Sequence, residues 1–286
     1  MKSRIFSYLW SALVMVLALA LSLVVAPHLR PSFEGGGVPF QSSPLWWVLG
    51  YFFAAVVVIA VVLFLLPLRY LKYVFRVVFA VMFAWGVLVI SFNLPDIASY
   101  VVAAIAGIAW LFFARIWLHD LLLLIALAAA SAVFGYLFSP VTFIIFILII
   151  SVYDVLAVRF GFMVWMADRL SGTASLPAFV FPKKTGDLAL NLKAVQVGEL
   201  KKEAAEKREH TILGGGDIGF PLMFSNSVYF ANNMWSAVLV GAFAVIGLMG
   251  AFIIQRVWLK GKPMPALPPI AVMSLIGFLI ASNFLK

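Results

Sequence analysis

Nine apolar stretches of about 20 residues, the length that spans a bilayer as a helix, constrain how this chain can fold. They cover residues 5–26, 45–66, 73–92, 97–115, 120–138, 141–162, 213–231, 234–255 and 268–285. With 65% hydrophobic and 11% charged residues, the chain is not an ordinary soluble domain. The first stretch is too long for a signal peptide and no clear cleavage site follows it. The sequence therefore predicts an all-α, polytopic membrane protein with nine transmembrane helices.

The distribution of positive charge predicts the orientation of these helices. If the amino terminus is cytoplasmic, all but Arg30 and Lys286 of the 20 Lys and Arg residues fall on the inner side. Lys and Arg accumulate in cytoplasmic loops. We therefore expect a multi-pass protein of the cell membrane with a cytoplasmic amino terminus and an extracytoplasmic carboxyl terminus. Nucleic acid is not an expected partner, because the aromatic residues lie inside apolar stretches rather than on a basic face.

We expect a single membrane domain interrupted by one long cytoplasmic loop. Residues 1–167 hold the first six helices, 168–212 form the loop, and 213–286 hold the last three helices. In the loop, Ser175 to Pro182 is extended in character, with β-favouring residues between two prolines. Residues 186–210 are predicted to form a loop and then a charged helix. No internal repeat is evident.

Two acids lie well inside apolar stretches, Asp154 in the sixth and Asp217 at the start of the seventh. A charge at membrane depth costs about 2.5–3.5 kcal/mol on insertion scales, so both need a functional explanation. From the helix rise, Asp154 lies about 8 Å from the cytoplasmic end of its helix near Arg159, and Asp217 lies about 9 Å from the start of its helix near Thr211. If the two helices are neighbours, the carboxylates can therefore face each other across a cavity.

Two carboxylates in contact share one proton near neutral pH, which suits acid–base hydrolysis of an amide. The ionised group takes a proton from water, while the protonated group polarises the carbonyl and then protonates the leaving nitrogen. Either aspartate can start as the base. No cofactor or metal is needed, and the chain has no cysteine. A shared metal site is not expected from His28, His119 and His210, which we assign to separate loops.

Other polar residues are given structural roles. Asp96 and Asp120 are expected to be caps or interface charges at helix ends. Asn226, Asn232 and Asn233 are interpreted as polar contacts between helices.

Glycines surround Asp217, and a proline-rich connection precedes the last helix. Gly214, Gly216 and their neighbours weaken the helix around the acid and let water or another backbone approach, although small residues can also form a helix-packing face. The segment from Pro263 to Pro269 is a stiff connection with an exposed backbone. Both this segment and the extended part of the long loop could dock an extended substrate strand.

Three motifs in this order resemble the presenilin and signal peptide peptidase intramembrane aspartyl proteases: Tyr153-Asp154, Gly214-x-Gly216-Asp217 and Pro265-Ala266-Leu267. The resemblance extends to the nine-helix plan. The absence of cysteine, the small size and the short loops resemble a prokaryotic, specifically an archaeal, member of this family.

The resemblance implies a role for each motif. Asp154 and Asp217 would be the catalytic pair. Tyr153, Gly214 and Gly216 would shape the active site, and the segment from Pro265 through Ala266 to Leu267 would position the substrate. The implied activity is that of an endopeptidase that hydrolyses single transmembrane helices within the lipid bilayer, after local unwinding.

Partner subunits are not expected to be obligatory, because residues 168–212 contain no apolar plug of the kind linked to maturation; homo-oligomers are left open. Two other functions compete with the protease. A proton- or cation-coupled transporter also uses buried acids and broken helices, but the absence of a repeat opposes it. A prepilin-peptidase-like enzyme also carries a Gly-x-Gly-Asp motif. The nine helices and the Pro265-Ala266-Leu267 motif oppose this third alternative.

Overall fold

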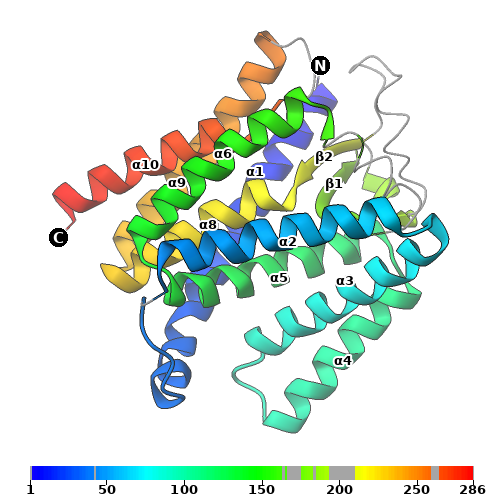
Figure 1. The fold of residues 1–286 in the computed structure, drawn as a ribbon, viewed down its shortest axis with the longest axis horizontal. Coiled ribbons are helices and arrows are strands. Elements are labelled where there is room, and N and C mark those ends of the chain that lie inside the picture. Colours follow the sequence, from blue (N-terminus) through cyan, green and yellow to red (C-terminus); the bar gives the residue numbers. More distant parts are fainter. Residues whose placement is uncertain are drawn as a thin grey trace. The chain divides into compact units, whose positions relative to one another are not determined.

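The computed structural model describes residues 2–41, 43–162, 165, 175–182, 185–192, 210–258 and 264–285. In these residues it contains nine α-helices, one 3-10 helix and two β-strands (Figure 1). They are α1 (Lys2–Gly35), α2 (Leu45–Leu65), α3 (Leu68–Ile90), α4 (Asp96–Phe112), α5 (Ile116–Leu137), α6 (Pro140–Arg159), β1 (Ala178–Pro182), η1 (Thr185–Ala189), β2 (His210–Gly214), α8 (Gly215–Ala231), α9 (Met234–Val257) and α10 (Leu267–Phe284).

The helices confirm a polytopic membrane protein. Seven of those in the described residues are long and apolar enough to cross a bilayer, and α4 is a shorter apolar helix. The predicted tight connection between the fifth and sixth helices is also present. Ser139 caps α6 by accepting the Thr142 amide at 3.2 Å, and Pro140 occupies the first helical position, where its missing N–H costs nothing.

The chain divides into two compact units. The first comprises residues 1–7, 46–126 and 160–214, and the second comprises residues 8–45, 127–159 and 215–286. Helices α1 and α5 each contribute residues to both units. Asp154, Asp217 and Leu267 all belong to the second unit.

In the second unit, α8, α9 and α10 pack on one another, and α6 packs against α8 and α10 (Figure 1). Two glycines allow the close approach of α9 and α10. A Cβ at Gly247 would lie 2.7 Å from the Cα of Ile270, and one at Gly277 would lie 2.9 Å from the Cβ of Phe243. Small residues at such contacts let helix backbones come together where the hydrophobic effect between helices is weak.

The first unit contains a two-stranded antiparallel sheet made by β1 and β2. Its register places Ala178 opposite Gly214 and Val180 opposite Ile212. The expected extended stretch is therefore confirmed over Ala178–Pro182. The expected helix start at residue 213 is wrong, because Leu213 and Gly214 belong to β2 and α8 begins at Gly215. The β-branched pair before them, Thr211 and Ile212, favours the strand.

Other helix boundaries also differ from expectation, among them the end of α1 and the starts of α3 and α5. Helix α1 continues through Pro27 and Pro31 to Gly35 instead of ending at residue 26. Prolines are tolerated in membrane helices where nearby groups satisfy the freed backbone. Helix α5 begins at Ile116 rather than residue 120, which brings His119 and Asp120 into its first turns.

The segment after α6 is only partly described. Thr185–Ala189 forms a 3-10 helix, and Asn191 forms an antiparallel bridge with Arg115. The charged helix expected before residue 210 lies outside the described residues.

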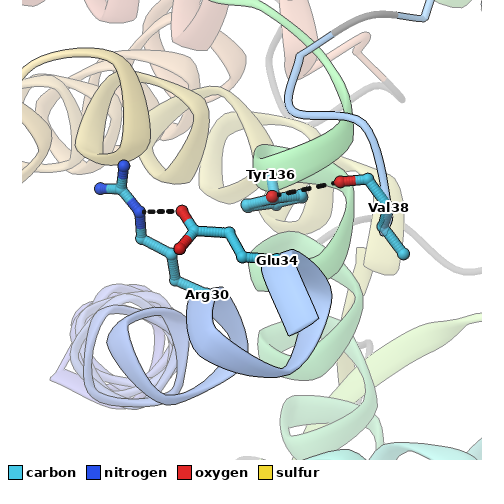
Figure 2. A network of polar contacts seen from close by, with 4 residues as sticks. All are labelled: Arg30, Glu34, Val38 and Tyr136. Carbon is cyan, nitrogen blue, oxygen red and sulfur yellow. Dashed lines mark hydrogen bonds and ion pairs between the residues drawn. The ribbon is translucent and has the colours of Figure 1, made fainter. Parts of the chain in front are cut away.

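The connection after α1 is fixed to other parts of the second unit. Figure 2 shows the Tyr136 hydroxyl donating to the Val38 carbonyl at 3.3 Å. Gln41 adopts a left-handed conformation with φ of 44° and binds at two points. Its backbone N–H donates to the Tyr136 carbonyl, and its side-chain amide donates to the Ser227 carbonyl, each at 3.1 Å.

Candidate active site

Asp154 is a carboxylate buried inside the second unit. It lies on α6, five residues before the helix ends at Arg159, and its residue is 4% exposed. Its Oδ2 accepts the backbone N–H of Leu267 at 3.3 Å. Its Oδ1 is buried and makes no hydrogen bond with any residue that the structure describes. One carboxylate oxygen is therefore held by the protein, while the other is available to a proton, a water molecule or a substrate.

The donor to Asp154 comes from the amino-terminal end of α10. Leu267 is the first residue of this helix, and its N–H has no intrahelical partner because the first amides of any helix lack one. Pro268 and Pro269 follow and have no N–H to offer. Leu267 is thus the first backbone donor in α10. The positive end of the helix dipole also favours an anion at this position.

Pro265 and Ala266 precede α10 and are half-buried, whereas the Leu267 side chain is buried. Ala266 is the N-cap residue and offers no side-chain cap. The motif Pro265-Ala266-Leu267 therefore reaches Asp154 through its backbone, a contact that the sequence alone did not predict.

Asp217 is the third residue of α8 and is half-buried. Gly216 beside it is exposed, and a Cβ added there would lie 3.1 Å from a ring carbon of Phe220. Gly214 ends β2, so the chain changes from strand to helix within the Gly214-x-Gly216-Asp217 motif. Measured from the observed start of α8, Asp217 is only about 3 Å along the helix, because each residue adds about 1.5 Å. The equal depth of the two aspartates stays a prediction.

The structure brings the helices that carry the three motifs together. Helix α6 packs against α8, and α10 packs against both. The rings of Phe146 on α6 and Phe220 on α8 meet edge to face with centroids 5.5 Å apart. Phe220 lies one turn after Asp217. The expectation that the helices carrying Asp154 and Asp217 are neighbours is confirmed.

The remaining predicted residues have different surroundings. Tyr153 precedes Asp154 on α6 and is half-buried. The three histidines do not lie in loops as expected: His28 is in α1, His119 is in α5 and His210 begins β2. Among the residues that the structure describes, no group of His, Cys, Asp and Glu is arranged to hold a metal ion.

Sequence reasoning missed the role of two adjacent residues. Asp120 is not a helix cap: its Oδ1 accepts the backbone N–H of Val180 in β1 at 3.1 Å. His119, fully buried, bonds the Ala178 carbonyl through Nε2 at 3.2 Å. A signal was present, since two adjacent titratable residues at the start of an apolar stretch are costly unless they have partners.

Comparison with known proteins identifies a family and a shared fold. The family model "Signal-peptide peptidase, presenilin aspartyl protease" matches residues 10–286. Two solved structures of a presenilin family intramembrane aspartate protease, in different space groups, share the fold with a TM-score of 0.61 and 18% identity. The first match covers 95% of this chain and 98% of the other, and the second covers 94% and 96%. A comparison with curated proteins gives no match.

The match extends over almost all of the chain and includes the helices that carry all three motifs. This multi-pass membrane protein is therefore an aspartic endopeptidase that belongs to the signal-peptide peptidase and presenilin family of aspartyl proteases.

Proposed function

We propose that the protein hydrolyses peptide bonds of transmembrane-helix substrates within the membrane, with Asp154 and Asp217 as the general acid–base pair. The observation that carries the proposal is the bond from the Leu267 amide to Asp154 Oδ2, made in a unit where α6, α8 and α10 pack together. A buried acid with a dedicated backbone donor, beside the helix that begins with a second acid, is an arrangement suited to catalysis.

The chemistry needs one ionised and one protonated carboxyl group. The ionised group takes a proton from the attacking water, and the protonated group donates a hydrogen bond to the scissile carbonyl. When the tetrahedral intermediate collapses, the leaving nitrogen receives a proton from the pair. In the protonated state of Asp154 the proton sits on Oδ1, since Oδ2 accepts the Leu267 N–H. Because the Leu267 contact occupies Oδ2, Oδ1 is the atom that we propose to act on the reacting groups.

The other motif residues are assigned supporting roles. Gly214 and Gly216 keep side chains away from Asp217, which leaves space for water and for the substrate backbone. Tyr153 is proposed to shape the site beside Asp154. Pro265 and Ala266 are non-helical and are proposed to position the substrate, because residues outside a regular element offer backbone groups to an extended chain.

The proposed substrates are single-span membrane proteins or peptides, unwound locally before cleavage, and no partner subunit is required. We propose a cell-membrane location with the amino terminus in the cytoplasm and the carboxyl terminus outside. All but Arg30 and Lys286 of the 20 Lys and Arg residues then fall on the inner side. Arg30, the internal exception, pairs with Glu34 at 2.8 Å on the same helix (Figure 2), so its charge is locally balanced.

The test is cleavage of a generic single-span substrate by the purified protein in proteoliposomes. Asp154→Asn and Asp217→Asn should each lower the cleavage rate by at least about 1,000-fold, because the residues of one catalytic unit act together. The matched control is Asp96→Asn, which neutralises an exposed acid at the start of α4 and should leave the rate unchanged.

Cleavage retained by either aspartate variant would reject the acid–base pair. Coupled proton or cation flux that both variants abolish, without any proteolysis by the wild type, would instead identify a transporter.

A further inference from the structure

We infer that His119 and Asp120 are positioning residues, which hold the β1–β2 sheet and thereby the start of α8 that carries Asp217. The inference rests on the proposed function for its kinetic consequence only. Its structural part concerns the first unit, to which α3, α4, the start of α5 and both strands belong.

The side chains of His119 and Asp120 form hydrogen bonds with the backbone of alternate residues along one edge of β1. His119 Nε2 bonds the carbonyl of Ala178, and Asp120 Oδ1 accepts the N–H of Val180. A carbonyl can only accept, so Nε2 of His119 carries the hydrogen. In an antiparallel pair, alternate residues direct their N–H and C=O groups to opposite edges. The backbone N–H and C=O groups of Ala178 and Val180 therefore point toward α5, and those of Phe179 point toward the backbone of β2.

Both edges of β1 are thus occupied inside the first unit, one by β2 and one by α5. For Ala178–Pro182, this corrects the expectation that the extended part of the loop could dock a substrate strand, because a docked strand needs an edge with open backbone groups. The five strand residues are buried, as a segment fixed on both sides should be.

Three aromatic rings pack around the His119 ring and fix its orientation. The rings of Phe79 and Phe83 on α3 and of Trp110 on α4 surround it, with centroid distances of 6.0, 5.6 and 6.0 Å. Phe83 and Trp110 also meet edge to face at 5.2 Å. A side chain packed among large rings has one rotamer available, so its hydrogen bond has a defined direction. The position of β1 is therefore set by three helices through one imidazole.

The pairing of β1 with β2 connects these two hydrogen bonds to the Gly214-x-Gly216-Asp217 motif. Ala178, the residue that His119 holds, is opposite Gly214 in β2. Gly214 is bonded to Gly215, the first residue of α8, and Asp217 follows two residues later. No residue separates the end of β2 from the first residue of α8. A displacement of β1 would therefore move the start of α8, and misplacement of a catalytic group by about 1 Å can cost about a hundredfold in rate.

The experiment compares variants that remove each bond with variants that retain it. Asp120→Ala removes the acceptor, whereas Asp120→Asn keeps an oxygen that can accept the Val180 N–H. His119→Phe keeps a ring among the aromatic residues but removes the donor, whereas His119→Gln keeps an N–H at similar reach. Asp96→Ala is the control for loss of an acid elsewhere in the first unit.

Two readouts are measured on each purified full-length variant. Hydrogen exchange of the peptides covering residues 176–182 and 210–214 reports the sheet without any need for catalysis. Cleavage of a single-span substrate gives kcat and KM separately. We expect Asp120→Ala and His119→Phe to raise the exchange rate of Val180 and its neighbours and to lower kcat by about tenfold to a hundredfold, with a smaller change in KM. The Asn and Gln variants should restore most of both properties.

Unchanged hydrogen exchange of residues 176–182 and 210–214 in Asp120→Ala would show that Asp120 does not hold the sheet. Faster exchange with an unchanged kcat would overturn the positioning role, since the sheet would then be free to move without consequence. Variants that fail to fold are recognised by their elution on size exclusion. In that case the inference is tested by comparing the exchange rate and kcat of the wild type with those of Asp120→Asn and His119→Gln. A loss of kcat in these two conservative variants with exchange unchanged would also overturn the inference. The exchange result stands whether or not Asp154 and Asp217 prove to be catalytic.

Discussion

The backbone N–H of Leu267 donates to Oδ2 of Asp154 at 3.3 Å, which joins the first residue of α10 to a buried acid on α6. The residues are far apart in sequence, and the contact uses the backbone, so no side-chain substitution at position 267 removes it except proline. The contact therefore predicts that position 267 tolerates change in its side chain better than change in its amide.

Replacement of the peptide bond between Ala266 and Leu267 by an ester should lower kcat by about tenfold, because it removes the N–H and leaves every side chain in place. Leu267→Met, which keeps the amide and the apolar volume, should retain most of the activity. The measurement is the cleavage rate of a single-span substrate by both forms. Equal rates for the ester and the wild type would show that the bond does not contribute to catalysis.

Gly216→Ala should reduce cleavage while leaving the fold as stable as before or more so. A Cβ at this exposed position would press on the Phe220 ring at 3.1 Å, next to Asp217. Alanine in place of glycine in a helix otherwise contributes about 0.5–1 kcal/mol to stability. Thermal unfolding and cleavage are measured together. Gly250→Ala is the control, since nothing lies within 4 Å of its added Cβ in α9; it should be stabilising and active.

Gly247→Ala should destabilise the second unit by about 1–3 kcal/mol, because the new Cβ would lie 2.7 Å from the backbone of Ile270 and the helices α9 and α10 would have to separate. The loss is measured as a fall in the midpoint of unfolding in detergent, relative to Gly250→Ala. A midpoint equal to that of the control would mean that the two helices are not held at this separation.

A buried polar cluster in the second unit should couple three helices. The Asn226 side-chain amide on α8 donates to Ser22 Oγ on α1 and to the Leu222 carbonyl, each at 2.9 Å, and Ser131 Oγ on α5 lies 3.4 Å from the same nitrogen. A double-mutant cycle with Asn226→Ala and Ser22→Ala should give a coupling energy of about 0.6–1.7 kcal/mol in unfolding measurements. Strictly additive effects would contradict the direct bond.

The sheet register predicts a specific disulfide in a chain that has no cysteine of its own. Val180 and Ile212 are opposite each other and form a non-hydrogen-bonded pair of the antiparallel sheet. The Cα atoms of such a pair are about 4.5 Å apart, which is within the range for a disulfide. Val180→Cys with Ile212→Cys should cross-link on mild oxidation. Val180→Cys with Leu213→Cys should not, because those side chains lie on opposite faces. Cross-linking of the second pair in preference to the first would indicate another register.

The sequence predicts the parts of this molecule that depend on local composition. Apolar length marks the helices, and the cost of burying a charge singles out Asp154 and Asp217. The pairing of β1 with β2 could not be predicted, because strand partners are distant in sequence and Thr211 to Gly214 continue into an apolar helix without interruption. His119 and Asp120 signal a need for partners, but their roles were missed because those partners are backbone groups of a remote segment, which the sequence does not identify.

The direct passage from β2 into α8 has a consequence for how this chain can vary in length. An insertion of a single residue within 210–214 would turn the following strand residues to the other face of the sheet. If the extra residue is instead taken up by α8, the residues of this helix that follow it rotate by about 100° around its axis, since one turn takes 3.6 residues. The face on which each strand residue lies and the rotation of Asp217 about the axis of α8 thus both depend on the number of residues from 210 to 217. Relatives that keep both should be free of insertions and deletions across this junction.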